Sequence, residues 1–236
     1  MDFTSRSKES ELMDDPKMDA EKYREAYLDI NRCNRLLGGY GITINAVKSL
    51  LKKPVKKSYT ILDMGCGDGE MLRRISKAFE KQGLEAKLIG VDLRDDVLDI
   101  ARSKSKEYTN INFTKQDILE LKDDFDCDIV LCTLTMHHFT DEQIHIFLKK
   151  FNTLAKIGVV INDLERSKLS YGLFKLFSIV FIKTAIAKYD GLVSISKGFR
   201  KKELLTYSRQ LKTAIHTIKW KWAFRYVWVM QTNRLN

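Results

Sequence analysis

The sequence predicts an α/β protein with a doubly wound, mostly parallel sheet of seven strands. Short apolar runs alternate with amphipathic helical patterns between about residues 59 and 164, and this alternation is typical of a parallel sheet with helices on both faces. A glycine-rich turn joins the first strand of this series to the helix that follows it. Two more apolar segments close the chain. We expect them to form an antiparallel hairpin, which large parallel sheets often carry at one edge.

The elements follow from the hydrophobic period and from the residues at their ends. Two helices come first, over 19–37 and 42–51, and Gly38 and Gly39 are expected to close the first of them. The series then contains, in chain order, strand 59–64, helix 69–81, strand 86–93, helix 95–106, strand 111–117, strand 127–134, helix 141–154 and strand 156–164. A last helix and the hairpin follow, over 201–210, 213–219 and 224–231.

The pattern predicts a single domain, 19–236, behind a flexible N-terminal tail, 1–18. The tail is polar and lacks an apolar run, so we expect neither a packed core nor a secretory signal there. Helices over 19–53 are expected to cover the site. A second helical segment, 167–190, interrupts the regular alternation after the last parallel strand, and we expect it to form a lid over the carboxyl edge of the sheet.

This inserted segment is apolar but contains Lys175 and Lys183. Its longest uncharged run, Leu176 to Ile182, is far shorter than the about 20 residues that cross a bilayer. Three interpretations remain open. The segment is an ordinary core helix, a lid that forms an apolar substrate pocket, or an interfacial helix in peripheral contact with a membrane.

Charge and cysteine content limit the possible classes. The net charge is +10, and the segment 161–236 holds 15 Lys and Arg against 4 Asp and Glu. This basic third predicts either a solvated surface or contact with nucleic acid, an anionic membrane or an acidic substrate. The four cysteines show no CxxC pair, and no His/Cys cluster has zinc spacing. We therefore expect a reduced, cytoplasmic protein without a metal site.

The glycine turn is the most specific local pattern. Gly65, Gly67 and Gly69 let the chain turn sharply and bring its backbone against a ligand, and the next helix directs its N–H groups into the same crevice. The third glycine comes one residue earlier than in a dinucleotide fingerprint. Asp63 and Asp68 also make the turn too acidic for a pyrophosphate. We therefore expect a ligand with a cationic ammonium or sulfonium group.

Acids also end the next two strands. Asp92 ends the second, where a carboxylate can accept hydrogen bonds from both ribose hydroxyls. Asp117 ends the third, within reach of an adenine amino group. Together the three strand ends predict a site for an adenosine-containing cation.

These stretches, "LDMGCGDGEML", "GVDL" and "KQDIL", resemble the cofactor motifs of class I S-adenosylmethionine-dependent methyltransferases. The resemblance covers about residues 57–165 and implies a Rossmann-like methyltransferase fold with S-adenosylmethionine as cofactor. It implies cofactor contacts from Asp63, Gly65, Cys66, Gly67, Gly69, Asp92, Leu93, Asp117, Ile118, Thr133 and Leu134. Arg35 is a further candidate, for the cofactor's carboxylate; the alternative is a basic residue that simply ends its helix.

The segments "YLDINRCNRLLGGYGITI", "LCTLTMHHF", "VVINDLERSKLSYGLFKLF" and "YDGLVSISKGFRKKEL" look like those of bacterial small-molecule methyltransferases associated with type III polyketide synthases. That branch implies a phenolic or similar hydrophobic acceptor. We expect Tyr171, Phe174, Phe177 and Asp190 to line its pocket.

Methyl transfer to a phenol needs a near-attack geometry and removal of the hydroxyl proton. His137 and His138 follow the fourth strand, and a neutral histidine can accept that proton near pH 7. The alternative is a structural histidine pair. Asp163, after the fifth strand, is expected to orient the acceptor or a histidine.

The leading interpretation is therefore methyl transfer to the hydroxyl of a hydrophobic, phenolic or polyketide-derived small molecule. One alternative is C-methylation of a quinone-type ring. The other is methylation of nucleic acid, which the basic C-terminal third favours. The absence of a DPPY-type or NPPF-type motif after the fourth strand argues against nucleic acid.

Overall fold

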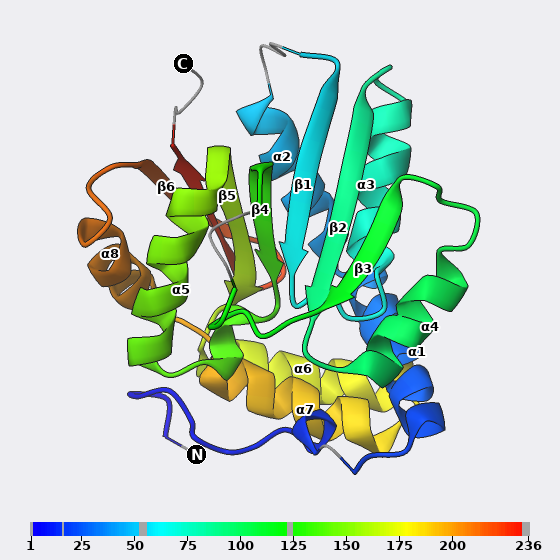
Figure 1. Cartoon of the computed structure of the whole chain (residues 1–236). Coiled ribbons are helices and arrows are strands. Elements are labelled where there is room, and N and C mark those ends of the chain that lie inside the picture. The colour runs from blue at the N-terminus through cyan, green and yellow to red at the C-terminus, as the bar shows by residue number, and fades with distance from the viewer. Residues whose placement is uncertain (1, 16, 52–55, 122–124, 233–236) are drawn as a thin grey trace.

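A computed structural model describes residues 2–15, 17–51, 56–121 and 125–232. Its centre is a seven-stranded sheet with strand order β3-β2-β1-β4-β5-β7-β6 (Figure 1). Five strands are parallel, and β7 runs antiparallel to both of its neighbours. The strands are β1 Ser58–Met64, β2 Glu85–Asp92, β3 Ile111–Lys115, β4 Cys127–Thr133, β5 Ala155–Leu164, β6 Ile215–Lys221 and β7 Arg225–Gln231. The predicted fold class is confirmed.

Helices pack on both faces of the sheet because its central strands are apolar on both sides. In β1, Ile61 packs with the cluster around α2 and α3, and Leu62 packs with the cluster around α5 and α8. The helices are α1 Ala20–Leu36, α2 Gly39–Leu50, α3 Glu70–Glu80, α4 Asp95–Lys104, α5 Asp141–Leu154, α6 Lys168–Phe181, α7 Ala185–Lys197 and α8 Lys201–Arg209. Two 3-10 turns are η1 Leu12–Asp14 and η2 Met136–His138. In the predicted cover 19–53, the last two residues lie outside the described ranges.

The inserted segment forms two helices, α6 and α7, which cross the carboxyl ends of the parallel strands (Figure 1). Thr184 begins α7 by accepting a hydrogen bond from Ala187 N. On α6, Leu176, Ile179 and Val180 are exposed, and the main contacts of this helix are with α7 and α1. The core-helix interpretation is therefore wrong, because α6 lies across the sheet edge and turns one apolar side outward. None of the described helices is long and apolar enough to cross a bilayer.

The N-terminal segment runs along α7 towards η2 (Figure 1). Arg6 donates hydrogen bonds to the backbone carbonyls of His137, Phe139 and Lys197. Glu11 is only 7% exposed. Part of the segment 1–18 is therefore held against the rest of the protein, although most of its described residues are exposed, and the flexibility of the tail stays a prediction. The contacts form because polar side chains of this segment find partners in the protein, which composition does not reveal.

Candidate active site

A cavity of about 1230 Å³ opens at the carboxyl edge of the parallel strands. This is where open α/β sheets bind ligands. Its walls come from the glycine turn, the strand ends, α1, the two inserted helices and the N-terminal segment. The sheet fixes the position of the turn and the strand ends, because their backbones continue from hydrogen-bonded strands.

The glycine turn has the conformation that its sequence predicts. Gly65, Gly67 and Gly69 have φ values of 72°, 52° and 76°, a region that side chains with a Cβ rarely adopt. Asp92 Oδ2 accepts a hydrogen bond of 3.0 Å from Gly67 N. Gly65, Cys66 and Gly67 line the cavity. Gly69 stands behind them at the start of α3, where an added Cβ would lie 2.7 Å from the Phe113 ring.

Asp63 lies beneath this turn and is 2% exposed. Its Oδ1 has no hydrogen-bond partner among the described residues, although the side chain lines the cavity. Burial, with a smaller effect of the neighbouring Asp92, raises the pKa of Asp63 to about 8. A buried acceptor without a partner favours a ligand that brings a donor or a positive charge.

Most other predicted cofactor residues also line the cavity, namely Asp92, Leu93, Asp117, Ile118, Thr133 and Leu134. Arg35 does not. It lies on the exposed side of α1, because the apolar and amide side chains of that helix turn inward instead. The placement of Arg35 fits the alternative, a basic residue near a helix end.

The cover helices instead contribute Tyr27, Asn31 and Tyr40 to the cavity wall. The Tyr40 hydroxyl donates to Asn31 Oδ1 (2.5 Å), and Asn31 Nδ2 donates to Asp68 Oδ2 (2.7 Å). This chain of hydrogen bonds connects α1 and α2 to the glycine turn. The spacing of Tyr27 and Asn31, one helical turn apart, was the available signal for a shared face.

His137 and Asp163 form a buried pair beside the cavity. His137 Nδ1 lies 2.7 Å from Asp163 Oδ1, and Asp163 Oδ2 accepts a hydrogen bond from His137 N. Burial opposes a charge on the ring, but the Asp163 and Glu11 carboxylates outweigh it and raise the pKa of His137 to about 9. His137 is therefore charged near pH 7 in this arrangement and does not match the neutral base that we expected.

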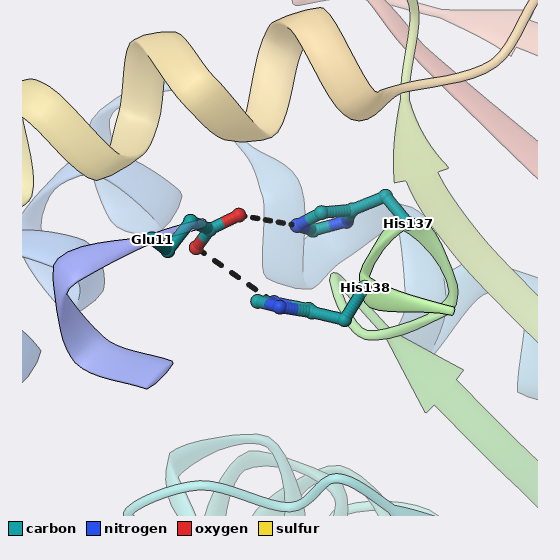
Figure 2. A group of neighbouring side chains, drawn as sticks. All are labelled: Glu11, His137 and His138. Atoms are coloured by element: carbon teal, nitrogen blue, oxygen red, sulfur yellow. Dashed lines mark ion pairs between the residues drawn. The ribbon is translucent and has the colours of Figure 1, made fainter. Parts of the chain in front are cut away.

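Glu11 and Asp14, two residues that sequence reasoning missed, approach the histidine pair from the N-terminal segment. Figure 2 shows the Glu11 carboxylate directed at both rings. Asp14 Oδ1 lies 3.3 Å from His138 Nδ1. No local pattern connects these acids with a histidine pair more than 120 residues later, and only the fold brings them together.

The predicted acceptor pocket is partly in place. Phe174 and Phe177 line the cavity from α6. Tyr171 is absent from that lining and packs edge-on against Phe3, with ring centroids 5.5 Å apart. Asp190 reaches the cavity, but its carboxylate accepts hydrogen bonds from the backbone N–H groups of Leu12 and Met13. Burial raises the pKa of Asp190 to about 6.

Arg225, at the start of β7, was also missed. It is 3% exposed and lines the cavity. One guanidinium nitrogen, Nη2, donates to Asn34 Oδ1 (2.8 Å), whereas Nε and Nη1 have no partner among the described residues. Burial lowers the pKa of Arg225, yet an arginine in a protein keeps its proton. The cavity therefore contains a fixed cation that suits an anionic ligand group.

Comparison with known proteins agrees with this geometry. Residues 61–158 match a family model described as "Methyltransferase domain". That part of the chain is therefore similar to a methyltransferase domain. The chain is 28% identical over 144 residues to a demethylmenaquinone methyltransferase of Staphylococcus carnosus, an alignment that covers 61% of this chain and 58% of that protein. The match thus spans little more than half the length of this relative.

The chain also resembles solved structures. One is the plantazolicin methyltransferase BpumL in complex with a monoazolic desmethylPZN analog and SAH (16% identity, 91% of this chain, 96% of that chain, TM-score 0.67). Another is a SAM-dependent methyltransferase from Aquifex aeolicus (16% identity, 92% and 100%, TM-score 0.59). These similarities show the fold. The predicted enzyme class, a methyltransferase, and the predicted cofactor, S-adenosylmethionine, both agree with these findings.

Proposed function

We propose that the methyltransferase transfers a methyl group from S-adenosylmethionine to the hydroxyl of a hydrophobic phenolic or polyketide-derived small molecule. Asp63 and the glycine turn bind the methionine part of the cofactor, Asp92 with Leu93 binds the ribose, and Asp117 with Ile118 binds the adenine. Phe174 and Phe177 contact the acceptor. His137 and His138 bind the acceptor hydroxyl where it loses its proton, and Asp163 orients His137.

The observation that carries this proposal is one continuous cavity that most residues of both sets line, with Gly69 and Asp163 directly behind its wall. It extends from the glycine turn to the histidine pair and the α6 aromatic side chains. Its volume of about 1230 Å³ exceeds the roughly 300–1,000 Å³ of a typical single-ligand site. The cavity can therefore hold a cofactor and an acceptor side by side, as direct methyl transfer requires.

A second candidate is C-methylation of a quinone-type ring, because the similar protein from Staphylococcus carnosus carries the name demethylmenaquinone methyltransferase. The same cofactor site would supply the methyl group, and the aromatic side chains of α6 would contact the quinone ring. Nucleic-acid methylation has less support, since Phe174 and Phe177 line the acceptor side of the cavity and no DPPY-type or NPPF-type motif follows the fourth strand. Peripheral membrane contact through the exposed face of α6 and a cytoplasmic location stay predictions.

The test is methyl uptake from methyl-labelled S-adenosylmethionine with two acceptor panels, phenolic lipids and reduced naphthoquinones lacking the ring methyl group. Mass spectrometry and carbon NMR of the product distinguish an O-methyl from a C-methyl group. Label on a phenolic oxygen supports the proposal, whereas label on a ring carbon supports the second candidate. Label in neither panel, with the cofactor bound, contradicts both.

Cofactor affinity is expected to rise with pH. Asp63 has a pKa of about 8 in the free protein, so it is mostly protonated at lower pH and must lose its proton to pair with the cofactor's ammonium. The affinity should therefore increase by up to about tenfold per pH unit between about pH 6 and pH 7.5, below the range where an α-amino group itself titrates. Calorimetry at several pH values measures this slope. Asp63→Asn should bind weakly and without the slope; an unchanged slope would exclude Asp63 as its origin.

Arg225→Gln is expected to lower the affinity for a ligand with an anionic group by about 10-fold to 100-fold, because a hydrogen bond to a charged group is worth about 1.5–3 kcal/mol. A loss of S-adenosylhomocysteine affinity would assign Arg225 to the cofactor carboxylate. A rise in the acceptor KM alone would assign it to an acidic group of the acceptor. The exposed Arg209 of α8 provides the control, and Arg209→Gln should change neither quantity. No change in Arg225→Gln would contradict an anion-binding role.

A further inference from the structure

Three side chains with metal-binding atoms meet where the N-terminal segment crosses η2. They are Glu11, His137 and His138, and one ligand atom of each lies within 4.8 Å of those of the other two. His137 Nε2 is 3.5 Å from Glu11 Oε1, and His138 Nε2 is 3.8 Å from Glu11 Oε2. Figure 2 shows the carboxylate facing the two imidazole edges. The cluster thus brings two imidazoles and one carboxylate to a common point.

The other nitrogen of each ring lies near a carboxylate. His137 Nδ1 is 2.7 Å from Asp163 Oδ1, and His138 Nδ1 is 3.3 Å from Asp14 Oδ1. Histidines that bind metals almost always donate their second N–H to a carboxylate, a carbonyl or water, which fixes the ring and directs the other nitrogen at the ion. Here both Nε2 atoms are directed at Glu11 in that way.

One of these nitrogens has no hydrogen-bond partner. His137 is 2% exposed, and its Nε2 makes no hydrogen bond with any described residue. The 3.5 Å separation from Glu11 is an ionic contact, longer than the 2.7–3.2 Å of a hydrogen bond. A buried nitrogen without a partner calls for an additional group in the cluster.

Charge around the cluster also favours a cation. Three carboxylates surround it, those of Glu11, Asp14 and Asp163. One ammonium is nearby, Lys197 Nζ, which lies 3.6 Å from both Glu11 Oε1 and Asp14 Oδ2. The three carboxylates outnumber this ammonium by two, and in the free protein the His137 proton offsets part of that excess. A divalent ion bound at Nε2 would take the place of this proton and balance both negative charges.

We propose that Glu11, His137 and His138 bind a divalent transition-metal ion. Two histidines and one carboxylate are the ligand set of catalytic zinc sites and of non-haem iron sites, and both leave positions open for other ligands. Metal–ligand bonds of about 2.0–2.2 Å place neighbouring ligand atoms about 3.3 Å apart on a tetrahedron. The 3.5 and 3.8 Å separations run from the two histidines to the two oxygens of one carboxylate, so each nitrogen lies close to the spacing that a shared ion requires.

All three side chains line the same cavity as the glycine turn. An open position on the ion would therefore be available to the acceptor hydroxyl, and a metal-bound oxygen loses its proton far more readily than a free one. This consequence rests on the proposed function. The metal site itself does not, because it depends only on the three ligands and their carboxylate partners.

The experiment is a titration of the chelator-treated full-length protein with Co²⁺, followed by visible absorption. We expect one Co²⁺ per chain, with the d–d bands of a low-coordinate site. Glu11→Gln and His138→Gln should each remove these bands. Asp14→Asn, which changes only a carboxylate behind a ligand, should weaken binding by about 10-fold to 100-fold. The matched control is His145→Gln, because the His145 ring packs on Tyr207 outside the cluster; it should bind as wild type does.

Absence of Co²⁺ uptake by the wild type, or equal uptake by Glu11→Gln and His138→Gln, would overturn the site. X-ray absorption of the Zn²⁺-loaded wild type provides a check without any variant: nitrogen and oxygen ligands support the site, and sulfur ligands would place the ion at a cysteine and overturn it. Co²⁺ binding without methyl uptake would leave the site standing and count against the proposed function. Full methyl transfer by a protein that binds no Co²⁺ would overturn the metal site and leave the proposed function standing.

Discussion

Replacing Asp92 by alanine is expected to reduce the affinity for S-adenosylmethionine and S-adenosylhomocysteine by at least about 100-fold, since hydrogen bonds to a charged group are worth about 1.5–3 kcal/mol each. The Asp92 carboxylate has two roles. Asp92 Oδ2 accepts from Gly67 N and Oδ1 from Arg94 N, so it fixes the shape of the glycine turn. It is also the group that we propose for the ribose hydroxyls. Isothermal titration calorimetry measures both affinities.

Asp99→Ala is the matched control for this variant. Asp99 lies on α4, the helix that follows Asp92 in the chain. Its side chain is 74% exposed, and it pairs with Arg102. The control should bind both compounds as the wild type does. Wild-type affinity in Asp92→Ala would show that the strand-end carboxylate does not hold the cofactor, and the ligand of the turn would need a new assignment.

Gly65→Ala is expected to lower the free energy of unfolding by about 2–5 kcal/mol. A left-handed backbone costs a residue with a Cβ about 1–2 kcal/mol, and Gly65 has φ of 72°. The added Cβ would also lie 2.4 Å from Thr135 Cγ2 and 2.5 Å from its Oγ1, and such overpacking typically costs about 1–3 kcal/mol. Urea denaturation measures the loss, and cofactor affinity should fall with it because Gly65 lines the cavity.

A glycine of α2 provides the comparison. An added Cβ at Gly41 would meet no atom within 4 Å, so Gly41→Ala should leave stability unchanged or raise it by up to about 1 kcal/mol. In the double variant Gly65→Ala with Thr135→Ala, the stability lost through the clash with Thr135 should be recovered. The stability lost because alanine must adopt a left-handed backbone should remain lost. Equal stability of Gly65→Ala and the wild type would contradict the tight turn described here.

The sequence predicted the sheet because its signals are local and repeated. Each central strand is a short apolar run buried on both faces, as in β4 where Ile129 and Val130 pack on opposite sides of the sheet. Such runs and their helices can be found in sequence by length and period alone. Most boundaries moved by a few residues at most, as at α2, which begins at Gly39 and not at residue 42. The inserted segment differs more, because α7 continues to Lys197 and not only to residue 190.

The inserted segment shows the limit of this reasoning. Its apolar composition left a core helix open beside the expected lid, but Leu176, Ile179 and Val180 of α6 are exposed. Composition reports how apolar a helix is, whereas burial depends on what lies beside it. The segment follows the last parallel strand at the sheet edge, where no second layer covers its outer side.

The sequence by itself determined the sheet, the glycine turn and the acids at the strand ends, Asp63, Asp92 and Asp117. These residues belong to one continuous local pattern of strand, turn and helix, so their positions follow from the fold class. The tertiary structure alone decided that Arg225 and not Arg35 faces the cavity, and that Glu11 meets the histidine pair. Those contacts join segments more than 120 residues apart, and their partners are selected by packing across the carboxyl edge of the sheet, for which a linear sequence contains no spacing rule.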